Sequence, residues 1–133
     1  MPATSLSVAH YGHPLLKGAK HWSFLLQTYE GRAVAYQITG STNTYEFKEP
    51  EEIEILKSQT YLGRVQVGAI DTAKQGRLLA VLKNVPIQRG DLQWNCQNWI
   101  VESLKALQED GFDVIALTHE DLGMKLQAAQ RDG

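Results

Sequence analysis

The sequence contains one cysteine, Cys96, among 133 residues. A single thiol cannot build a disulfide framework or a zinc site of several cysteines, which favours a reducing compartment, and we expect a cytoplasmic protein. No apolar run approaches the roughly 18 residues of a membrane span. The segment 1–5 has neither a basic region nor a long apolar stretch, which argues against secretion. The sequence therefore predicts no integral membrane segment.

Charge of one sign is also lacking. Thirteen Lys and Arg residues stand against fifteen Asp and Glu residues, and the two kinds are scattered along the chain. Without a basic patch there is no electrostatic footprint for a phosphate backbone, so we expect no nucleic-acid partner. We also expect no metal and no cofactor. A small-molecule or peptide substrate remains the predicted partner.

The length and the 43% hydrophobic content fit one domain, 1–133, with a single core. Turn formers punctuate the first part of the chain, so residues 1–20 are predicted to be an arm or loop that leads into the domain, with at most one edge strand at 5–9. No internal repeat is present.

Two extended segments, 21–27 and 32–39, flank the turn Glu30–Gly31 and predict a β-hairpin. In the first segment the alternation places Trp22 on the core face and His21 on the other face. The remaining signals predict an α+β fold, a small antiparallel sheet packed on helices. They indicate a strand at 45–47, followed by a solvated acidic run at 49–54, and a second strand at 61–70. A helix is expected from 71 or 72 to 84, a strand or helix entry at 114–117 and a tail helix within 120–130.

The clearest helix begins at Cys96, with Asn95 as N-cap and Gly111 as the stop signal. Cys96 shares one helix face with apolar residues four, eight and eleven positions later, so it faces inward at the first turn. One interpretation is a small core residue, as most lone intracellular cysteines are. The other is a nucleophile, because free backbone N–H groups and the helix dipole stabilise a thiolate there.

A thiol nucleophile needs a base, and the chain has four histidines. His21 is the best candidate, since it opens a strand that can hold its ring beside the cysteine helix. The alternative is a half-exposed histidine at a strand end. His10 and His13 are expected at the surface, and His119 is expected to cap the tail helix.

The segments His21–Leu25 and Asn95–Trp99 resemble the permuted papain-like, NlpC-type cysteine hydrolases, in which a strand histidine precedes a cysteine at a helix start. Lecithin retinol acyltransferase-like phospholipid acyltransferases and PPPDE-type isopeptidases carry similar pairs. The resemblance covers about thirty residues. It implies a papain-like fold, a Cys96 nucleophile and a His21 base.

The acyltransferases place a second histidine on the returning strand, and no histidine lies between His21 and Cys96 here. If the hairpin keeps a comparable register, Gln37 lies near His21 and its amide oxygen orients the ring, giving a Cys-His-Gln triad; otherwise a Cys-His dyad remains. A slip of one or two residues would put Thr39 or Tyr36 there instead. Gln37 would then be an exposed strand residue.

The cysteine also has neighbours that suit a substrate pocket. Trp94, Asn95 and Trp22 are the candidates for oxyanion or substrate binding, although a tryptophan at position 94 more commonly packs a loop. The loops 40–60 and 86–94 are expected to build the pocket.

We therefore expect a thiol-dependent acyl-transfer enzyme that hydrolyses amide or peptide-like bonds. Two alternatives stay open: a lipid ester or thioester acyltransferase, and a non-catalytic binding domain that retains the fold. The acyltransferases tend to end in an apolar anchor that the segment 127–133 does not provide.

Overall fold

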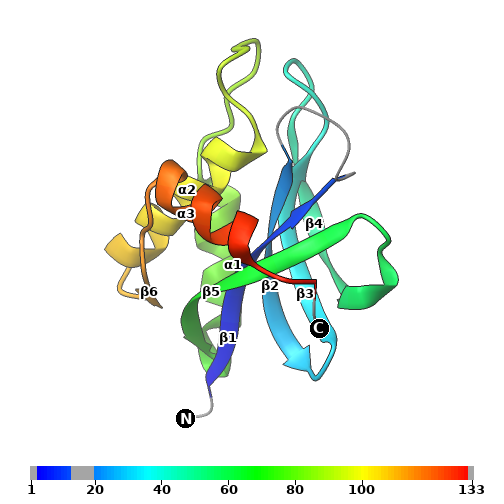
Figure 1. Cartoon of the computed structure of the whole chain (residues 1–133). Helices are drawn as coiled ribbons and strands as arrows, with labels where there is room; N and C mark the ends of the chain where they lie inside the picture. Colours follow the sequence, from blue (N-terminus) through cyan, green and yellow to red (C-terminus); the bar gives the residue numbers. More distant parts are fainter. Residues whose placement is uncertain (1–2, 13–19, 132–133) are drawn as a thin grey trace.

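The computed structural model describes residues 3–12 and 20–131, and within them the fold is α+β. Six antiparallel strands form one sheet in the order β4-β3-β2-β1-β5-β6, and three α-helices cover one of its faces (Figure 1). The elements are β1 (Ala3–Tyr11), β2 (His21–Tyr29), β3 (Arg32–Thr39), β4 (Glu46–Glu54), the 3-10 helix η1 (Ile55–Lys57), β5 (Tyr61–Asp71), the 3-10 helix η2 (Thr72–Lys74), α1 (Gln75–Asn84), α2 (Cys96–Glu109), β6 (Asp113–Val114) and α3 (His119–Ala128).

The predicted hairpin is confirmed as β2 and β3. Gly31 adopts a φ of 77° in the turn, a left-handed conformation that glycine adopts without steric cost. The side chains of Trp22 and Phe24 join the main core, whereas Leu25 faces a second, smaller apolar cluster. The two faces of β2 therefore carry different chemistry, as the alternation predicted.

The prediction of an arm or loop was wrong for residues 3–11, which form a strand that includes the expected strand at 5–9. β1 pairs with β2 on one side and with β5 on the other, so it is a central strand and not an edge strand. Leu6 and Val8 are fully buried, and His10, expected at the surface, is only 8% exposed. The turn-forming residues of the sequence follow β1 and mark the end of the strand. His13 lies outside the described residues.

The acidic run is also part of the sheet, since it lies within β4 instead of following a short strand. β4 pairs with β3 only, which makes it an edge strand. Arg32 on β3 donates to Glu52 at 2.9 Å and to Glu54 at 3.0 Å. Charged side chains on an edge strand discourage pairing with another chain.

The main core lies between the sheet and the helices. Trp99 of α2 is fully buried, and its ring centroid lies 5.8 Å from that of Phe24 and 6.0 Å from that of Phe47. The predicted inward face of α2 is confirmed, because all of its members are buried: Cys96, Ile100, Leu104 and Leu107. The second cluster, on the opposite face of the sheet, consists of Ala9, Leu25, Ala33, Ala35, Ile55 and Tyr61.

The other helices largely follow their sequence signals. The Asp71 side chain accepts a hydrogen bond from the N–H of Ala73 at the start of η2, which leads into α1. Thr118, and not His119, is the N-cap of α3. Of the segment 114–117, expected to be a strand or the entry to a helix, Val114 lies in the short strand β6, which pairs with β5 where Gly68 has no side chain to block it.

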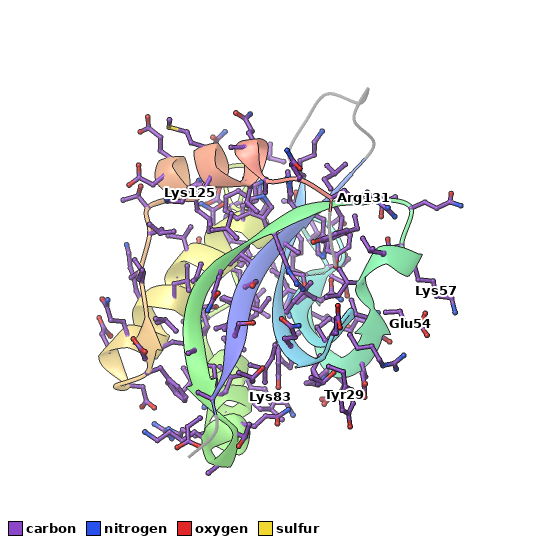
Figure 2. All side chains as sticks on the ribbon, turned by 60° about the horizontal axis from the view of Figure 1, so that its bottom comes forward. Tyr29, Glu54, Lys57, Lys83, Lys125 and Arg131 are labelled. Atoms are coloured by element: carbon purple, nitrogen blue, oxygen red, sulfur yellow. The ribbon has the colours of Figure 1, made fainter. Side chains whose placement is uncertain are left out.

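The segment after α3 returns to the turn between η1 and β5. Arg131 donates hydrogen bonds to the backbone carbonyls of Leu56, Ser58 and Tyr61, at 2.8, 3.1 and 3.1 Å. Figure 2 shows Arg131 close to the part of the chain that carries Lys57. The arginine thus fixes the segment that covers the second apolar cluster.

In residues 3–12 and 20–131 no helix has the length and the apolar composition needed to cross a membrane.

Candidate active site

The first turn of α2 is fixed by a reciprocal cap. The Oδ1 atom of Asn95 accepts from the N–H of Gln97 at 2.9 Å, and the Oδ1 atom of Asn98 accepts from the N–H of Asn95 at 2.9 Å. This capping box satisfies backbone donors that the helix itself cannot satisfy. Cys96 is consequently held as the first residue of the helix, as the sequence predicted.

The thiol of Cys96 is buried, with 8% of the residue exposed. Burial raises the pKa of the Cys96 thiol, while the backbone N–H groups of Trp22, Gln97 and Cys96 itself act in the opposite direction. The Sγ atom also lies 4.0 Å from the carbonyl oxygen of Lys20, to which the thiol donates. At neutral pH the thiol is therefore protonated, and three backbone donors surround the place where negative charge would form.

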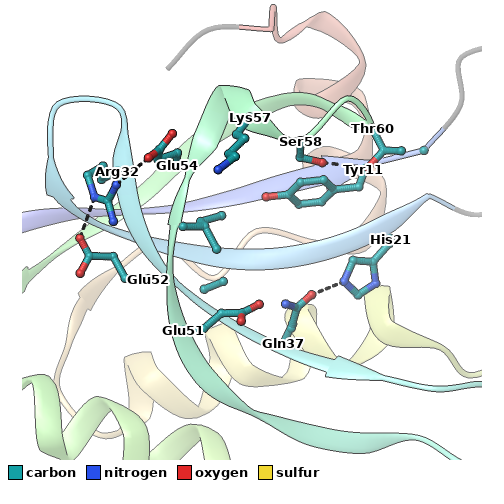
Figure 3. A pocket seen from close by; sticks show the side chains of 13 residues that line it. Tyr11, His21, Arg32, Gln37, Glu51, Glu52, Glu54, Lys57, Ser58 and Thr60 are labelled. Atoms are coloured by element: carbon teal, nitrogen blue, oxygen red, sulfur yellow. Dashed lines mark hydrogen bonds and ion pairs between the residues drawn. The ribbon is translucent and has the colours of Figure 1, made fainter.

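His21 is the first residue of β2, and its ring lies between side chains of the two neighbouring strands (Figure 3). Nε2 of His21 lies 2.5 Å from Oε1 of Gln37 on β3. On the other side, the ring of Tyr11 on β1 has its centroid 6.1 Å from that of His21. Because an amide oxygen can only accept, the Gln37 contact places the proton of a neutral ring on Nε2 and leaves Nδ1 as the nitrogen with a free lone pair.

The hairpin register explains this contact, although not in the way the sequence suggested. Phe24 pairs with Tyr36, and the same register continued by three residues places Thr39 opposite His21. Gln37 is therefore a diagonal neighbour, and diagonal neighbours across two strands are still within reach of long side chains. The residue opposite His21 is thus Thr39, an alternative that the sequence left open, and the predicted contact between His21 and Gln37 is present.

A cavity of about 530 Å³, which we call the Cys96 cavity, brings the two candidate residues to one place. Its wall contains Cys96 from α2, His21 from β2, the end of β3 and residues of the adjoining loops: Ile38, Thr39, Lys20, Gly40, Thr42, Tyr45, Leu92, Trp94 and Asn95.

The loops on the two sides of this cavity, around residues 40–45 and 86–94, are joined by hydrogen bonds. The N–H of Gly90 donates to the carbonyl of Thr42 at 2.8 Å, and Nε of Arg89 donates to the carbonyl of Tyr45 at 2.9 Å. The ring centroids of Tyr45 and Trp94 lie 5.8 Å apart. The loops expected to build the pocket therefore do so in part, since residues 46–54 of the first one form β4 instead.

The remaining predicted site residues divide into two kinds. Trp94 and Asn95 line the Cys96 cavity, and Trp94 also donates from Nε1 to Glu102 at 2.7 Å. The indole of Trp22 is buried in the main core, 5.2 Å from the ring of His119, so it does not face the cavity. Trp22 instead contributes its backbone N–H to the surroundings of the thiol, so of its two expected roles only the oxyanion one involves a group that lies there.

Gln97 was missed by sequence reasoning. Its Nε2 donates to the carbonyl of Lys20 at 2.8 Å, and its Oε1 lies 2.7 Å from Nε2 of His119. The side chain thus links α2 to the start of β2 and to α3. The available signal was its position directly after the cysteine, in the first turn of a capped helix.

A second cavity, of about 800 Å³, lies on the opposite face of the sheet; we call it the outer cavity. Its inner end is formed by Tyr11, His21 and Gln37, and its outer side by β4, η1 and the turn that follows (Figure 3). His21 lines both cavities, and its ring lies beside Tyr11 and Gln37 at the inner end of the outer cavity. In the part of the chain that the structure describes, no three His, Cys, Asp or Glu side chains gather as metal ligands.

A family model, described as a family of unknown function (DUF6540), matches residues 13–112. The chain belongs to this family. No curated protein and no solved structure matches it. The matched segment 13–112 includes His21, Gln37 and Cys96, whereas β1 and α3 lie outside it.

Proposed function

We propose that the protein is a thiol-dependent acyl-transfer enzyme that hydrolyses amide or peptide-like bonds. The observation that carries the proposal is the Cys96 cavity, which is lined by both Cys96 and His21 while Gln37 holds the far nitrogen of the His21 ring. A nucleophile, a base and an orienting group in one place is the arrangement that covalent acyl transfer requires.

In the first step, Nδ1 of His21 takes the thiol proton as the sulfur of Cys96 attacks the substrate carbonyl. The carbonyl oxygen becomes negative and accepts from the N–H of Cys96 at the first turn of α2. His21 then gives the proton to the leaving group as the bond between the carbonyl carbon and that group breaks. Water attacks the resulting thioester, with His21 again as base, and restores the free thiol.

Burial of the thiol defines which form of the mechanism fits. Because burial raises the pKa of Cys96, the resting protein holds a neutral thiol rather than a preformed thiolate paired with an imidazolium. Proton transfer to His21 therefore accompanies the attack. Such general-base assistance contributes roughly 10²- to 10⁴-fold in rate.

The same proposal specifies partner and compartment. The partner is a small-molecule or peptide substrate, and a reducing location such as the cytoplasm preserves the thiol that the mechanism needs. The alternative of a non-catalytic binding domain is favoured by one observation, the 8% exposure of Cys96. A lipid ester or thioester acyltransferase would use the same residues with another acceptor.

The test uses p-nitrophenyl acetate, a small activated acyl donor. The wild-type protein is expected to release a burst of p-nitrophenol and to gain one acetyl group at Cys96 by intact mass. Cys96→Ala should abolish the burst while the thermal unfolding midpoint shows a folded domain, because the position contributes little volume to the core. A wild-type protein that gains no acetyl group at Cys96 would favour the binding domain.

A further inference from the structure

We propose that the outer cavity binds the leaving-group portion of the substrate, an uncharged amine component of peptide-like chemistry, while the Cys96 cavity holds the acyl portion. The inference rests on the proposed function and specifies its substrate. The relationship that carries it is the position of His21, a residue that lines both cavities and whose ring lies at the inner end of the outer one.

Proton transfer sets where the leaving group must lie. The departing nitrogen has to come within hydrogen-bond distance of the His21 ring to receive its proton. The atoms attached to that nitrogen must then continue past the ring. The adjoining space is the outer cavity, which begins at the ring and is flanked there by Tyr11 and Gln37 (Figure 3).

The outer cavity has the size and the floor of a binding site. Its volume of about 800 Å³ lies within the roughly 300–1,000 Å³ typical of small-molecule sites. Ala35 lines it with a side chain that fills little of the space between β3 and η1. Ile53 adds a second apolar side chain. The space is thus left open by a small residue at a central position of the sheet.

The polar groups at the inner end match an amide chain. Oε1 of Gln37 is occupied by His21, so its NH₂ group is the part left to donate to a ligand carbonyl. The Tyr11 hydroxyl is a second donor, and burial first, then the neighbouring Tyr61, raises its pKa to about 12, which keeps it protonated. The Glu51 carboxylate, drawn beside Gln37 in Figure 3, can accept an N–H.

The charges around the cavity favour an uncharged ligand. Arg32 pairs with both Glu52 and Glu54, and Glu51 pairs with Lys48. Lys57 also lines the cavity, so three cations stand against these three carboxylates. A neutral peptide-like amine can therefore form hydrogen bonds in this cavity, whose charged side chains do not favour a ligand charge of either sign.

The reverse reaction offers a direct test, because a site for the leaving amine is also a site for an attacking amine. In acetylated Cys96 the carbonyl carbon forms a bond to the amine nitrogen as its bond to sulfur breaks. The proton lost by the amine passes to His21 and then to the departing thiolate. The products are an acetylated amine and the free thiol.

The experiment acetylates Cys96 with p-nitrophenyl acetate and measures the product formed with glycylglycinamide, with hydroxylamine as a small nucleophile that does not need the outer cavity. In the wild type, capture by glycylglycinamide is expected to saturate. Ala35→Leu, which fills the cavity, should lower the apparent affinity for glycylglycinamide at least 10-fold and leave hydroxylamine capture unchanged. Ala35→Ser, which keeps the space open, is the matched control.

If Ala35→Leu lowers the thermal unfolding midpoint so far that the variant cannot be assayed, Ser58→Phe is used instead. Ser58 lies half-buried in the turn after η1, and a phenylalanine there narrows the same cavity. A Cys96-dependent burst with glycylglycinamide capture that does not saturate, or that both cavity-filling variants leave unchanged, would overturn the inference while the proposed function stands. The absence of a burst in the wild type would refute the proposed function and the inference together.

Discussion

Oε1 of Gln37 lies 2.5 Å from Nε2 of His21, and this contact decides which nitrogen of the histidine can act as a base. A glutamine oxygen accepts but does not donate, so the neutral ring carries its proton on Nε2. In the proposed mechanism, Nδ1 is then the nitrogen left to exchange a proton with Cys96.

The first prediction concerns this orienting contact. Gln37→Ala should lower the rate of Cys96 acetylation, but by less than the roughly 10²- to 10⁴-fold loss expected for His21→Ala, because an orienting group transfers no proton itself. Gln37→His should retain activity, since an imidazole can also accept from Nε2. The rate constants of the burst phase measure both effects. Wild-type rates in Gln37→Ala with an intact fold would show that the contact has no part in the reaction.

The second prediction concerns the reactivity of the thiol in the free protein. Because burial raises its pKa, the rate of Cys96 alkylation by iodoacetamide should reach half of its maximum above the ordinary thiol value of about 8.5. Burial and the backbone N–H groups of Trp22, Gln97 and Cys96 determine this pKa, and His21 is not among its causes. His21→Ala should therefore leave the midpoint of the alkylation profile in place while it slows acetylation. A midpoint near neutral pH that rises in His21→Ala would instead reveal a thiolate–imidazolium pair.

The third prediction concerns His10, which is buried on β1. Burial and then the charge of Lys20 lower its pKa, and a hydrogen bond to the backbone of Leu126 only partly opposes them. Above about pH 6.5 both folded and unfolded chains hold a neutral ring. Below it the unfolded chain binds the proton first, so the free energy of unfolding should decrease as pH falls, by at most about 1.4 kcal/mol per pH unit from this group.

Urea unfolding at pH values from 7.5 to 5 checks this dependence, with His10→Gln as the control. Glutamine does not titrate and keeps a hydrogen-bond donor. The difference in unfolding free energy between the two proteins should therefore change below pH 6.5, in the variant's favour. A difference that stays constant with pH would place the His10 pKa at its ordinary value.

The fourth prediction concerns the cap of α2. Asn95→Ala removes the side-chain acceptor for the N–H of Gln97 and should lower the free energy of unfolding by about 0.5–2 kcal/mol. Asn95→Asp keeps an acceptor and should stay close to the wild type. Urea denaturation of the three proteins measures the series. A loss as large in Asn95→Asp as in Asn95→Ala would show that the cap contributes little.

Local signals in the sequence were sufficient for the hairpin and for α2. The turn at Gly31 and the cap at Asn95 act on neighbouring residues, so alternation and spacing near them carry real information. The contact between His21 and Gln37 also followed from the turn, because the two residues lie on strands joined by it.

Features that depend on distant pairing could not be predicted. β1 was mistaken for an arm because its pairing with β5 joins residues about sixty positions apart, and alternation alone does not reveal the partner. The link from Gln97 to His119 depends on how α3 docks on α2. The outer cavity likewise arises where η1 folds over β3, and no periodicity marks such a gap.

The central position of β1 has a practical consequence for anyone who trims this protein. The family match begins at residue 13, two residues beyond the end of β1. A fragment cut to residues 13–112 would keep His21 and Cys96 but lose the strand that joins β2 to β5. The two halves of the sheet would then each expose an unpaired edge, where backbone N–H and C=O groups are free to pair with other chains. Such a fragment would aggregate, and its inactivity would say nothing about the chemistry of the intact protein.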